Sequence, residues 1–162
     1  MSSRVGHGFD AHRYVEGRRL YLGGIEIPYE RGLLGHSDAD ALCHALGDAL
    51  LGAAALGDLG AHFPDTDVKW KNANSIELLK QCVELVWHAG FEIDNIDATI
   101  IVEQPKLAAH LPAMRQRISE VLNLPVTQVS VKAKTSEGMG YTGDGRGLAV
   151  HAVACLHTHD RK

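Results

Sequence analysis

The stretch HSDADALCHALGDALLGAAAL, residues 36–56, predicts a long helix that packs one side against a core. Ser37, followed by Asp40 three positions later, approximates a capping box, so we expect the helix to begin at Ser37 and to run through Leu56, before Gly57. At about 100° per residue the helix has an apolar side and a polar side. The apolar side holds Leu42, Leu46, Ala49 and Ala53, and the polar side holds Asp40, His44 and Asp48.

The segments around this helix predict a sheet with further helices. Residues 3–14 and 19–27 are rich in residues that suit strands, which we expect to meet near Gly23-Gly24. A second helix begins at Asn74 or Ser75 and ends before Gly90. The remaining predicted elements are a strand over 97–102, a helix over 109–122, a strand over 129–134 and a strand over 148–156. This order favours the α/β class, as an α+β sandwich in which helices cover one sheet within a single catalytic domain, residues 1–162.

Composition and charge exclude several classes of protein. The 162 residues are 45% hydrophobic and 22% charged, as in an ordinary globular domain. A formal net charge of −4, without a basic run carrying aromatic residues, argues against nucleic-acid binding. No apolar run is long enough for a membrane span and no signal-peptide core is present, so we expect a cytoplasmic protein. Cys43, Cys82 and Cys155 lack CxxC spacing and are interpreted as reduced packing residues.

One carboxylate and two imidazoles form a candidate metal site. Asp10 and His12 are two positions apart in a predicted strand, so their side chains leave the same face of the sheet. His44 on the helix is the third candidate ligand, with Asp40 or Asp48 as a possible acceptor for its second ring N–H. Three ligands with an open fourth position are typical of catalytic zinc. The alternative interpretation of the helix row is a solvated polar face.

Three loops are candidates for binding phosphate. Residues 57–67 form an irregular stretch rich in acids, and Pro105-Lys106 follows a predicted strand. Residues 132–137, KAKTSE, offer two ammonium groups, two hydroxyls and a carboxylate, a set suited to a diphosphate and a second metal. Residues 138–143 match GxGxxG literally, but a strand rather than a helix is expected next, so a dinucleotide site is rejected in favour of a tight loop near a ligand.

Six motifs in order along the chain resemble those of the 2-C-methyl-D-erythritol 2,4-cyclodiphosphate synthases. The motifs are GFDxH (8–12), GHSDxD (35–40), GDLG (57–60), FPDTD (63–67), AKTSE (133–137) and GYTG (140–143). The resemblance implies a ferredoxin-like subunit in a homotrimer with active sites between subunits. It also implies conversion of 4-diphosphocytidyl-2-C-methyl-D-erythritol 2-phosphate to the cyclic diphosphate, with release of CMP, in the non-mevalonate isoprenoid pathway.

The resemblance assigns roles to the matching positions. It implies zinc on Asp10, His12 and His44, and a magnesium or manganese ion on Glu137. It also implies that His36 and Thr135 stabilise the transition state. The other implied substrate-binding residues, alongside Asp10, His12, His36, Thr135 and Glu137, are Ser37, Asp58, Leu59, Gly60, Phe63, Pro64, Asp65, Thr66, Asp67, Val102, Glu103, Gln104, Pro105, Lys106, Leu107, Ala108, Lys134, Ser136, Tyr141 and Asp144.

The final loop departs from the family pattern. Gly138 stands where the family commonly has Lys, and Asp144 and Arg146 stand where it commonly has Arg and Glu. We expect an ion pair of reversed polarity between Asp144 and Arg146. In the family this pair lines a cavity on the trimer axis that holds isoprenoid phosphates, so altered ligand binding there, with catalysis retained, is the prediction.

Two other functions fit the same residues. A metal-dependent phosphohydrolase would place an open metal site beside phosphate-binding loops and activate water instead. His159-Asp160 superficially resembles the HD-type hydrolases, which are helical. A non-enzymatic binding module would use zinc only as a structural clip, so that metal removal would unfold the protein.

Overall fold

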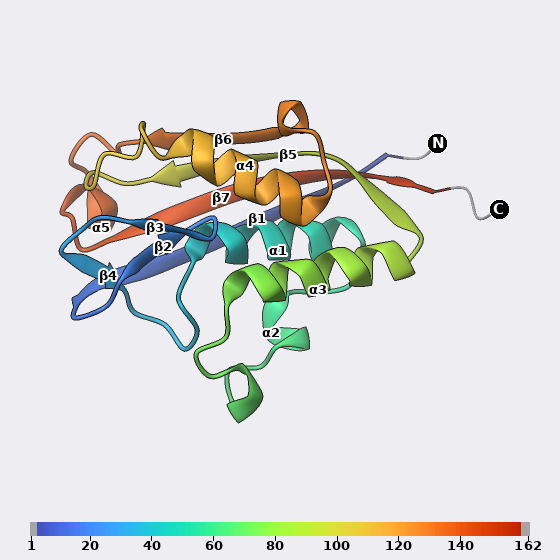
Figure 1. Cartoon of the computed structure of the whole chain (residues 1–162), viewed down its shortest axis with the longest axis horizontal. Coiled ribbons are helices and arrows are strands. Elements are labelled where there is room, and N and C mark those ends of the chain that lie inside the picture. The colour runs from blue at the N-terminus through green and yellow to red at the C-terminus, as the bar shows by residue number, and fades with distance from the viewer. Residues whose placement is uncertain (1–2, 160–162) are drawn as a thin grey trace.

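Two long antiparallel strands, β1 (Ser3–Glu16) and β7 (Gly147–Thr158), form the centre of a five-stranded sheet in the computed structural model, which describes residues 3–159 (Figure 1). The strand order is β4-β1-β7-β5-β6, with β5–β6 as the parallel pair. The other strands are β2 (Leu20–Leu22), β3 (Ile25–Ile27), β4 (Arg31–Leu33), β5 (Phe91–Ile101) and β6 (Val129–Lys134). A mixed sheet flanked by helices confirms the predicted fold class.

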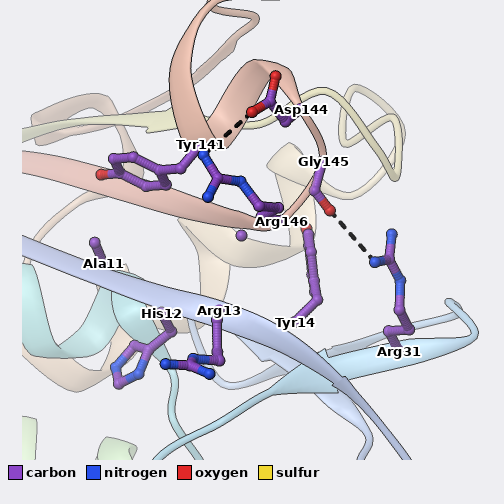
Figure 2. A pocket seen from close by; sticks show the side chains of 10 residues that line it. Ala11, His12, Arg13, Tyr14, Arg31, Tyr141, Asp144, Gly145 and Arg146 are labelled. Atoms are coloured by element: carbon purple, nitrogen blue, oxygen red, sulfur yellow. Dashed lines mark hydrogen bonds and ion pairs between the residues drawn. The ribbon is translucent and has the colours of Figure 1, made fainter.

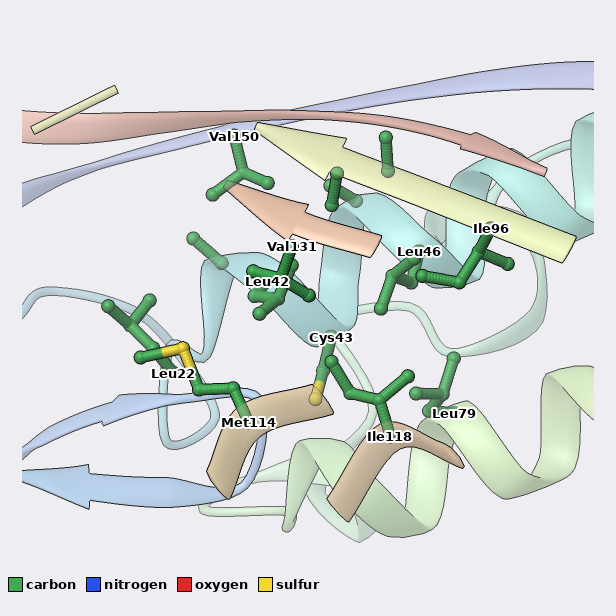
Figure 3. Close-up of a cluster of buried hydrophobic side chains, with 14 of the residues drawn as sticks. Leu22, Leu42, Cys43, Leu46, Leu79, Ile96, Met114, Ile118, Val131 and Val150 are labelled. Atoms are coloured by element: carbon green, nitrogen blue, oxygen red, sulfur yellow. The ribbon is translucent and has the colours of Figure 1, made fainter. Parts of the chain in front are cut away.

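The helices α1 (Ala41–Ala53), α3 (Ser75–His88) and α4 (Leu111–Leu122) lie together on one side of the sheet (Figure 1). Leu42 and Leu46 of α1 are buried among apolar side chains from the sheet, such as Val150, and from α4, such as Ile118 (Figure 3). The opposite side of the sheet, called the open face below, carries exposed apolar side chains. They are Val5 (68% exposed), Phe9 (48%) and Val153 (40%).

The remaining elements are short. They are α2 (Leu59–His62), α5 (Gly140–Gly143) and the 3-10 turns η1 (Val68–Trp70) and η2 (Val126–Gln128). Cys43, Cys82 and Cys155 are unpaired, as predicted, and burial raises the pKa of the Cys82 thiol to about 12. Among residues 3–159, no helix combines the length and apolar character that a membrane crossing requires.

Two glycines in β1 let α1 lie directly on the sheet. A Cβ atom at Gly8 would stand 1.9 Å from the backbone oxygen of Ala45, and one at Gly6 would stand 2.0 Å from that of Ala49. Both contacts are with helix backbone, which cannot rotate away as a side chain does. Because Asp10 and His12 follow on the same face of β1, this close approach brings them beside α1.

The cap of α1 is Asp40 and not Ser37, so the predicted start of the helix is wrong by several residues. The Asp40 carboxylate is fully buried and accepts hydrogen bonds from the backbone N–H groups of Cys43 (3.0 Å), Gly23 (2.9 Å) and Gly24 (2.7 Å). Ser37 instead accepts from Ala39 N in a local turn. Burial raises the pKa of Asp40, and the three N–H donors oppose that rise.

Replacing Asp40 with alanine is expected to lower the free energy of unfolding by about 3 kcal/mol, because three N–H donors lose one acceptor in a buried place. Urea unfolding measures the change. The matched control is Asp67→Ala, which removes an exposed cap from the short turn η1 and should cost about 1 kcal/mol or less. Equal losses in the two variants would contradict this account of Asp40.

Several predicted boundaries are corrected by the structure. Residues 19–27 are not one strand but the hairpin β2–β3, which turns at Gly23 and Gly24, both at positive φ. β5 begins at Phe91 rather than 97, and β4 and α2 were not predicted. The first helix ends at Ala53, because Ala55 adopts a left-handed φ of 58°. Residues 140–143, predicted as a tight loop, form the single helical turn α5.

Candidate active site

Asp10, His12 and His44 meet where β1 and α1 touch. His12 Nε2 lies 2.9 Å and His44 Nδ1 lies 3.0 Å from the same oxygen of Asp10, Oδ2. One ligand atom from each residue lies within 4.8 Å of the others. The alternation of β1 and the close packing of α1 on Gly6 and Gly8 therefore assemble the predicted triad within the single chain.

The imidazole of His12 is held with one nitrogen facing the triad. Its Nδ1–H donates to the carbonyl oxygen of Leu34 over 2.7 Å, and a carbonyl can only accept. When the ring is neutral, its lone pair lies on Nε2, which is buried and lies 2.9 Å from Asp10 Oδ2. A buried lone pair aimed at a carboxylate oxygen is the arrangement that a cation would complete.

The charges of the triad are strongly coupled. Burial alone would raise the pKa of Asp10, but hydrogen bonds and charge from His12 and His44 outweigh it and hold that pKa well below its usual range. Burial lowers the pKa of His44, and the Asp10 carboxylate more than reverses this. The Asp10 carboxylate therefore favours the protonated form of His44.

The donor set fits a divalent metal such as zinc. Zinc accepts both imidazole nitrogen and carboxylate oxygen as ligands, and three protein ligands leave one position for a substrate or water. The triad also opens to a cavity of about 540 Å³, whereas structural zinc sites are closed by four protein ligands. The arrangement is thus of the catalytic type.

The cavity beside the triad gathers many of the residues that the resemblance implicates. One wall comes from the 36–37 segment, and the other comes from α2 and the loop after it. The predicted residues that line it, besides the triad, are His36, Ser37, Leu59, Gly60, Phe63, Pro64, Asp65 and Thr66. Sequence reasoning missed Asp48, Trp70 and Leu78 as lining residues, because their place in the cavity depends on how α1, η1 and α3 meet.

Asp58 and Asp67 are not among the residues lining this cavity. The Asp58 carboxylate accepts from Ala61 N over 2.9 Å and caps α2, and Asp67 accepts from Lys69 N over 2.9 Å and caps η1. Both side chains thus hold the shape of the loop around the cavity.

The remaining implicated segments, 102–108 and 134–137, lie at the ends of the parallel strands β5 and β6. Glu103 joins them, since its Oε1 accepts from Ser136 N over 3.1 Å and from Gly138 N over 3.3 Å. Thr135 Oγ1 donates to Glu137 Oε1 over 3.2 Å. Lys106, Lys134 and Glu137 are exposed. The structure therefore brings a hydroxyl, two ammonium groups and a carboxylate to one edge of the sheet.

This second group of residues is separated from the triad within the chain. The register runs from Asp10 to Val150 on β7, to Ile100 on β5 and to Ala133 on β6. Three strand spacings amount to about 14 Å. Lys134 follows Ala133 and so points to the face opposite to that of Asp10. The two groups do not share one cavity in the single chain.

Asp144 and Arg146 form the expected ion pair of reversed polarity. Arg146 Nη2 lies 3.1 Å from Asp144 Oδ2. With Tyr141, they border a separate cavity of about 720 Å³, which Arg13 and Arg31 also line (Figure 2). Arg31 donates to the carbonyl of Gly145 over 3.3 Å and holds this loop against β4.

The prediction that Asp40 or Asp48 accepts the second N–H of His44 is wrong. Asp40 takes three backbone N–H groups instead, and Asp48 accepts from Leu59 N over 2.8 Å. His44 Nε2 faces two hydroxyl groups, Ser75 Oγ at 2.9 Å and Ser37 Oγ at 3.2 Å. Ser75 lies 31 residues away in sequence, which is why a helical spacing argument could not find it.

Comparison with known proteins decides the family. The sequence profile described as the YgbB family matches residues 3–157, nearly the whole chain. The chain belongs to the YgbB family. Two YgbB relatives named 2-C-methyl-D-erythritol 2,4-cyclodiphosphate synthase are each 56% identical to it, one from Salinibacter ruber (96% of this chain, 99% of the relative) and one from Paraburkholderia phymatum (96% and 98%). The resemblance seen in the motifs is confirmed, and these matches give no support to a phosphohydrolase.

Solved structures show the same fold at high similarity. A bifunctional IspDF from Campylobacter jejuni matches with a TM-score of 0.95 and 45% identity over 98% of this chain, which corresponds to 43% of that longer chain. A 2C-methyl-D-erythritol-2,4-cyclodiphosphate synthase described as a bound form with CDP matches with a TM-score of 0.88 and 40% identity, over 95% of this chain and 100% of that one. The YgbB assignment thus rests on sequence and fold together.

Proposed function

We propose that this protein converts 4-diphosphocytidyl-2-C-methyl-D-erythritol 2-phosphate to 2-C-methyl-D-erythritol 2,4-cyclodiphosphate and CMP. In this reaction an oxygen of the 2-phosphate attacks the β-phosphorus, and the bond from that phosphorus to the CMP oxygen breaks. The observation that carries the proposal is the open Asp10–His12–His44 triad beside a cavity, in a chain 56% identical to proteins named for this activity.

The triad is the proposed zinc site. Asp10, His12 and His44 would hold the ion, with Oδ2, Nε2 and Nδ1 as the atoms that face one another. When bound, the ion supplies a Lewis acid that neutralises charge on a phosphate oxygen. His36 and Ser37 line the same cavity and are proposed to donate hydrogen bonds to phosphate oxygens.

The reaction requires the protein mainly to position the reacting groups and to neutralise their charge. A phosphate monoester has a second pKa near 6 and is already a competent nucleophile at neutral pH. Holding the two reacting groups together contributes about 7–11 kcal/mol to lowering the barrier. The walls from α2, Phe63 and Pro64 are proposed to hold the methylerythritol part and to exclude water, which would otherwise give a linear product.

The second group of residues is proposed to bind the cytidine diphosphate end. Lys106 and Lys134 supply positive charge, and Thr135 supplies a hydroxyl donor for the transition state. Glu137 is the proposed ligand for magnesium or manganese, hard cations that prefer oxygen. The relative solved in a form bound to CDP supports a nucleotide site on this fold.

A homotrimer would bring the two groups of residues together. Ala133, beside the second group, lies about 14 Å across the sheet from Asp10, and Lys134 points to the opposite face, so we infer that a neighbouring subunit supplies the second group. Burial of the exposed Val5, Phe9 and Val153 of the open face provides an apolar driving force for assembly.

Light scattering after gel filtration is expected to give three times the mass of the chain, and a monomer that turns over substrate would contradict the inference.

Product analysis tests the proposed reaction. The purified protein, supplied with zinc and magnesium, is incubated with the diphosphocytidyl substrate and followed by ³¹P NMR. We expect equal amounts of CMP and the cyclic diphosphate. A linear phosphate product would indicate hydrolysis and would overturn the proposal, as would the absence of any product.

A further inference from the structure

The two ring nitrogens of His44 face different partners. Nδ1 faces Asp10 Oδ2 at 3.0 Å, while Nε2 points away from the triad toward Ser75 Oγ at 2.9 Å. Both ring nitrogens of His44 therefore have a polar partner. A nitrogen can bind a metal only when the ring proton is on the other nitrogen, so the contact at one nitrogen decides whether the other can bind.

The hydroxyl of Ser75 has a defined direction. Its single proton is donated to Asp38 Oδ1 in a short hydrogen bond, so its lone pairs are left to accept from His44 Nε2–H. The backbone N–H of Ser75 also donates to Asp38, to Oδ2 over 3.0 Å. The hydrogen bonds therefore run from His44 through Ser75 to the Asp38 carboxylate.

The environment makes this chain of hydrogen bonds rigid. Ser75 is 1% exposed, so water does not compete for its hydroxyl. It is the first residue of α3, and Asp38 thus places a negative charge at the N-terminus of a 14-residue helix, where the helix dipole favours it. Two backbone hydrogen bonds, Asn72 N to His36 O (3.0 Å) and Asp38 N to Ala73 O (3.3 Å), tie the same segments together.

Ser37 contacts the same nitrogen but differs in its surroundings. Its Oγ lies farther away, at 3.2 Å, accepts from Ala39 N and lines the cavity, where a substrate would compete for it. Ser75 does not line that cavity and contacts His44 from the protein side. Of the two hydroxyls, Ser75 is the one committed to His44.

We propose that Ser75 and Asp38 are positioning residues that hold His44 in the Nε2-protonated form and aim its Nδ1 lone pair at the metal. This inference rests on the proposed metal site of Asp10, His12 and His44 and extends it to two residues outside the triad. The effect is on affinity for the metal before any substrate binds. Loss of such an orienting contact typically weakens metal binding by about 10–100-fold.

Zinc affinity provides the first test. The full-length protein is freed of metal and titrated with zinc against a chromophoric chelator. We expect Ser75→Ala and Asp38→Asn to raise the Kd by about 10–100-fold and Ser75→Thr, which keeps the hydroxyl, to stay within about threefold of wild type. Ser119→Ala changes a buried serine of α4, a helix that supplies no residue to the triad or the cavity beside it; this variant is the matched control and should leave the Kd unchanged.

The tautomer of His44 provides a second test that needs no variant. Long-range ¹H–¹⁵N spectra of the zinc-loaded wild-type protein should show the proton on Nε2. A proton on Nδ1 would overturn the inference even if the variants fail to fold. If wild type binds zinc and both Ser75→Ala and Asp38→Asn bind it equally well, the positioning role is wrong while the metal site stands. If wild type itself binds no zinc, the metal site and this inference fail together.

Discussion

Asp10→Asn is expected to lower kcat/KM for cyclodiphosphate formation by about 10³-fold or more and to abolish tight zinc binding. The Asp10 oxygen Oδ2 lies within 3.0 Å of a nitrogen of each imidazole, and its negative charge attracts a divalent ion. An amide has the same shape but no charge, so the triad would keep its two imidazole ligands and lose its anionic one. Steady-state kinetics and a zinc titration measure the two effects.

The control for Asp10→Asn is Glu84→Gln, which removes one carboxylate charge from an exposed position of α3. It should leave both kcat/KM and zinc affinity near wild type. If Asp10→Asn bound zinc and turned over substrate as wild type does, the triad would not be the metal site.

Gly8→Val is expected to lower the free energy of unfolding by more than about 4 kcal/mol, or to prevent folding. A Cβ atom at this position would overlap the backbone oxygen of Ala45 at 1.9 Å, so α1 would have to move off β1. His44 moves with α1, and any folded fraction should therefore also bind zinc weakly. Urea unfolding and a zinc titration measure these changes.

Gly52→Ala is the matched control, because Gly52 lies near the end of the same helix and an added Cβ would meet its nearest atom, His7 O, only at 4.0 Å. Alanine is the better helix former, so this variant should gain about 0.5–1 kcal/mol. A fully stable Gly8→Val protein with an intact zinc site would show that the close packing of α1 on β1 does not position the triad.

The elements predicted best are those whose hydrophobic period is uninterrupted. The alternation of Val129, Val131 and Ala133 indicates β6, and the apolar steps from Ile76 to Val86 indicate α3. The first half of β5 was missed because a register shift between Ile93 and Asn95 breaks its alternation. Strands of three residues, such as β4, form only because a partner strand is present, which the local sequence does not show.

The three triad residues could be predicted from the sequence, but the residues that hold them in place could not. Asp10 and His12 share a face by strand alternation, and His44 shares a face of its helix with polar residues, so local periodicity identifies all three. Ser75 resembles an ordinary residue at a helix start, and only the packing of α3 against α1 brings it to His44. Asp40 was misassigned because its hydrogen bonds go to the β2–β3 turn, a contact between distant segments.

The most direct test of the metal-dependent synthase is a zinc titration of chelated wild-type protein at constant magnesium, with turnover and melting temperature recorded at each step. We predict that chelation abolishes formation of CMP and the cyclic diphosphate, that turnover returns in proportion to zinc and levels off at one ion per chain, and that the melting temperature changes little. Turnover that persists after zinc is removed, or unfolding on its removal, would contradict a catalytic zinc site at Asp10, His12 and His44.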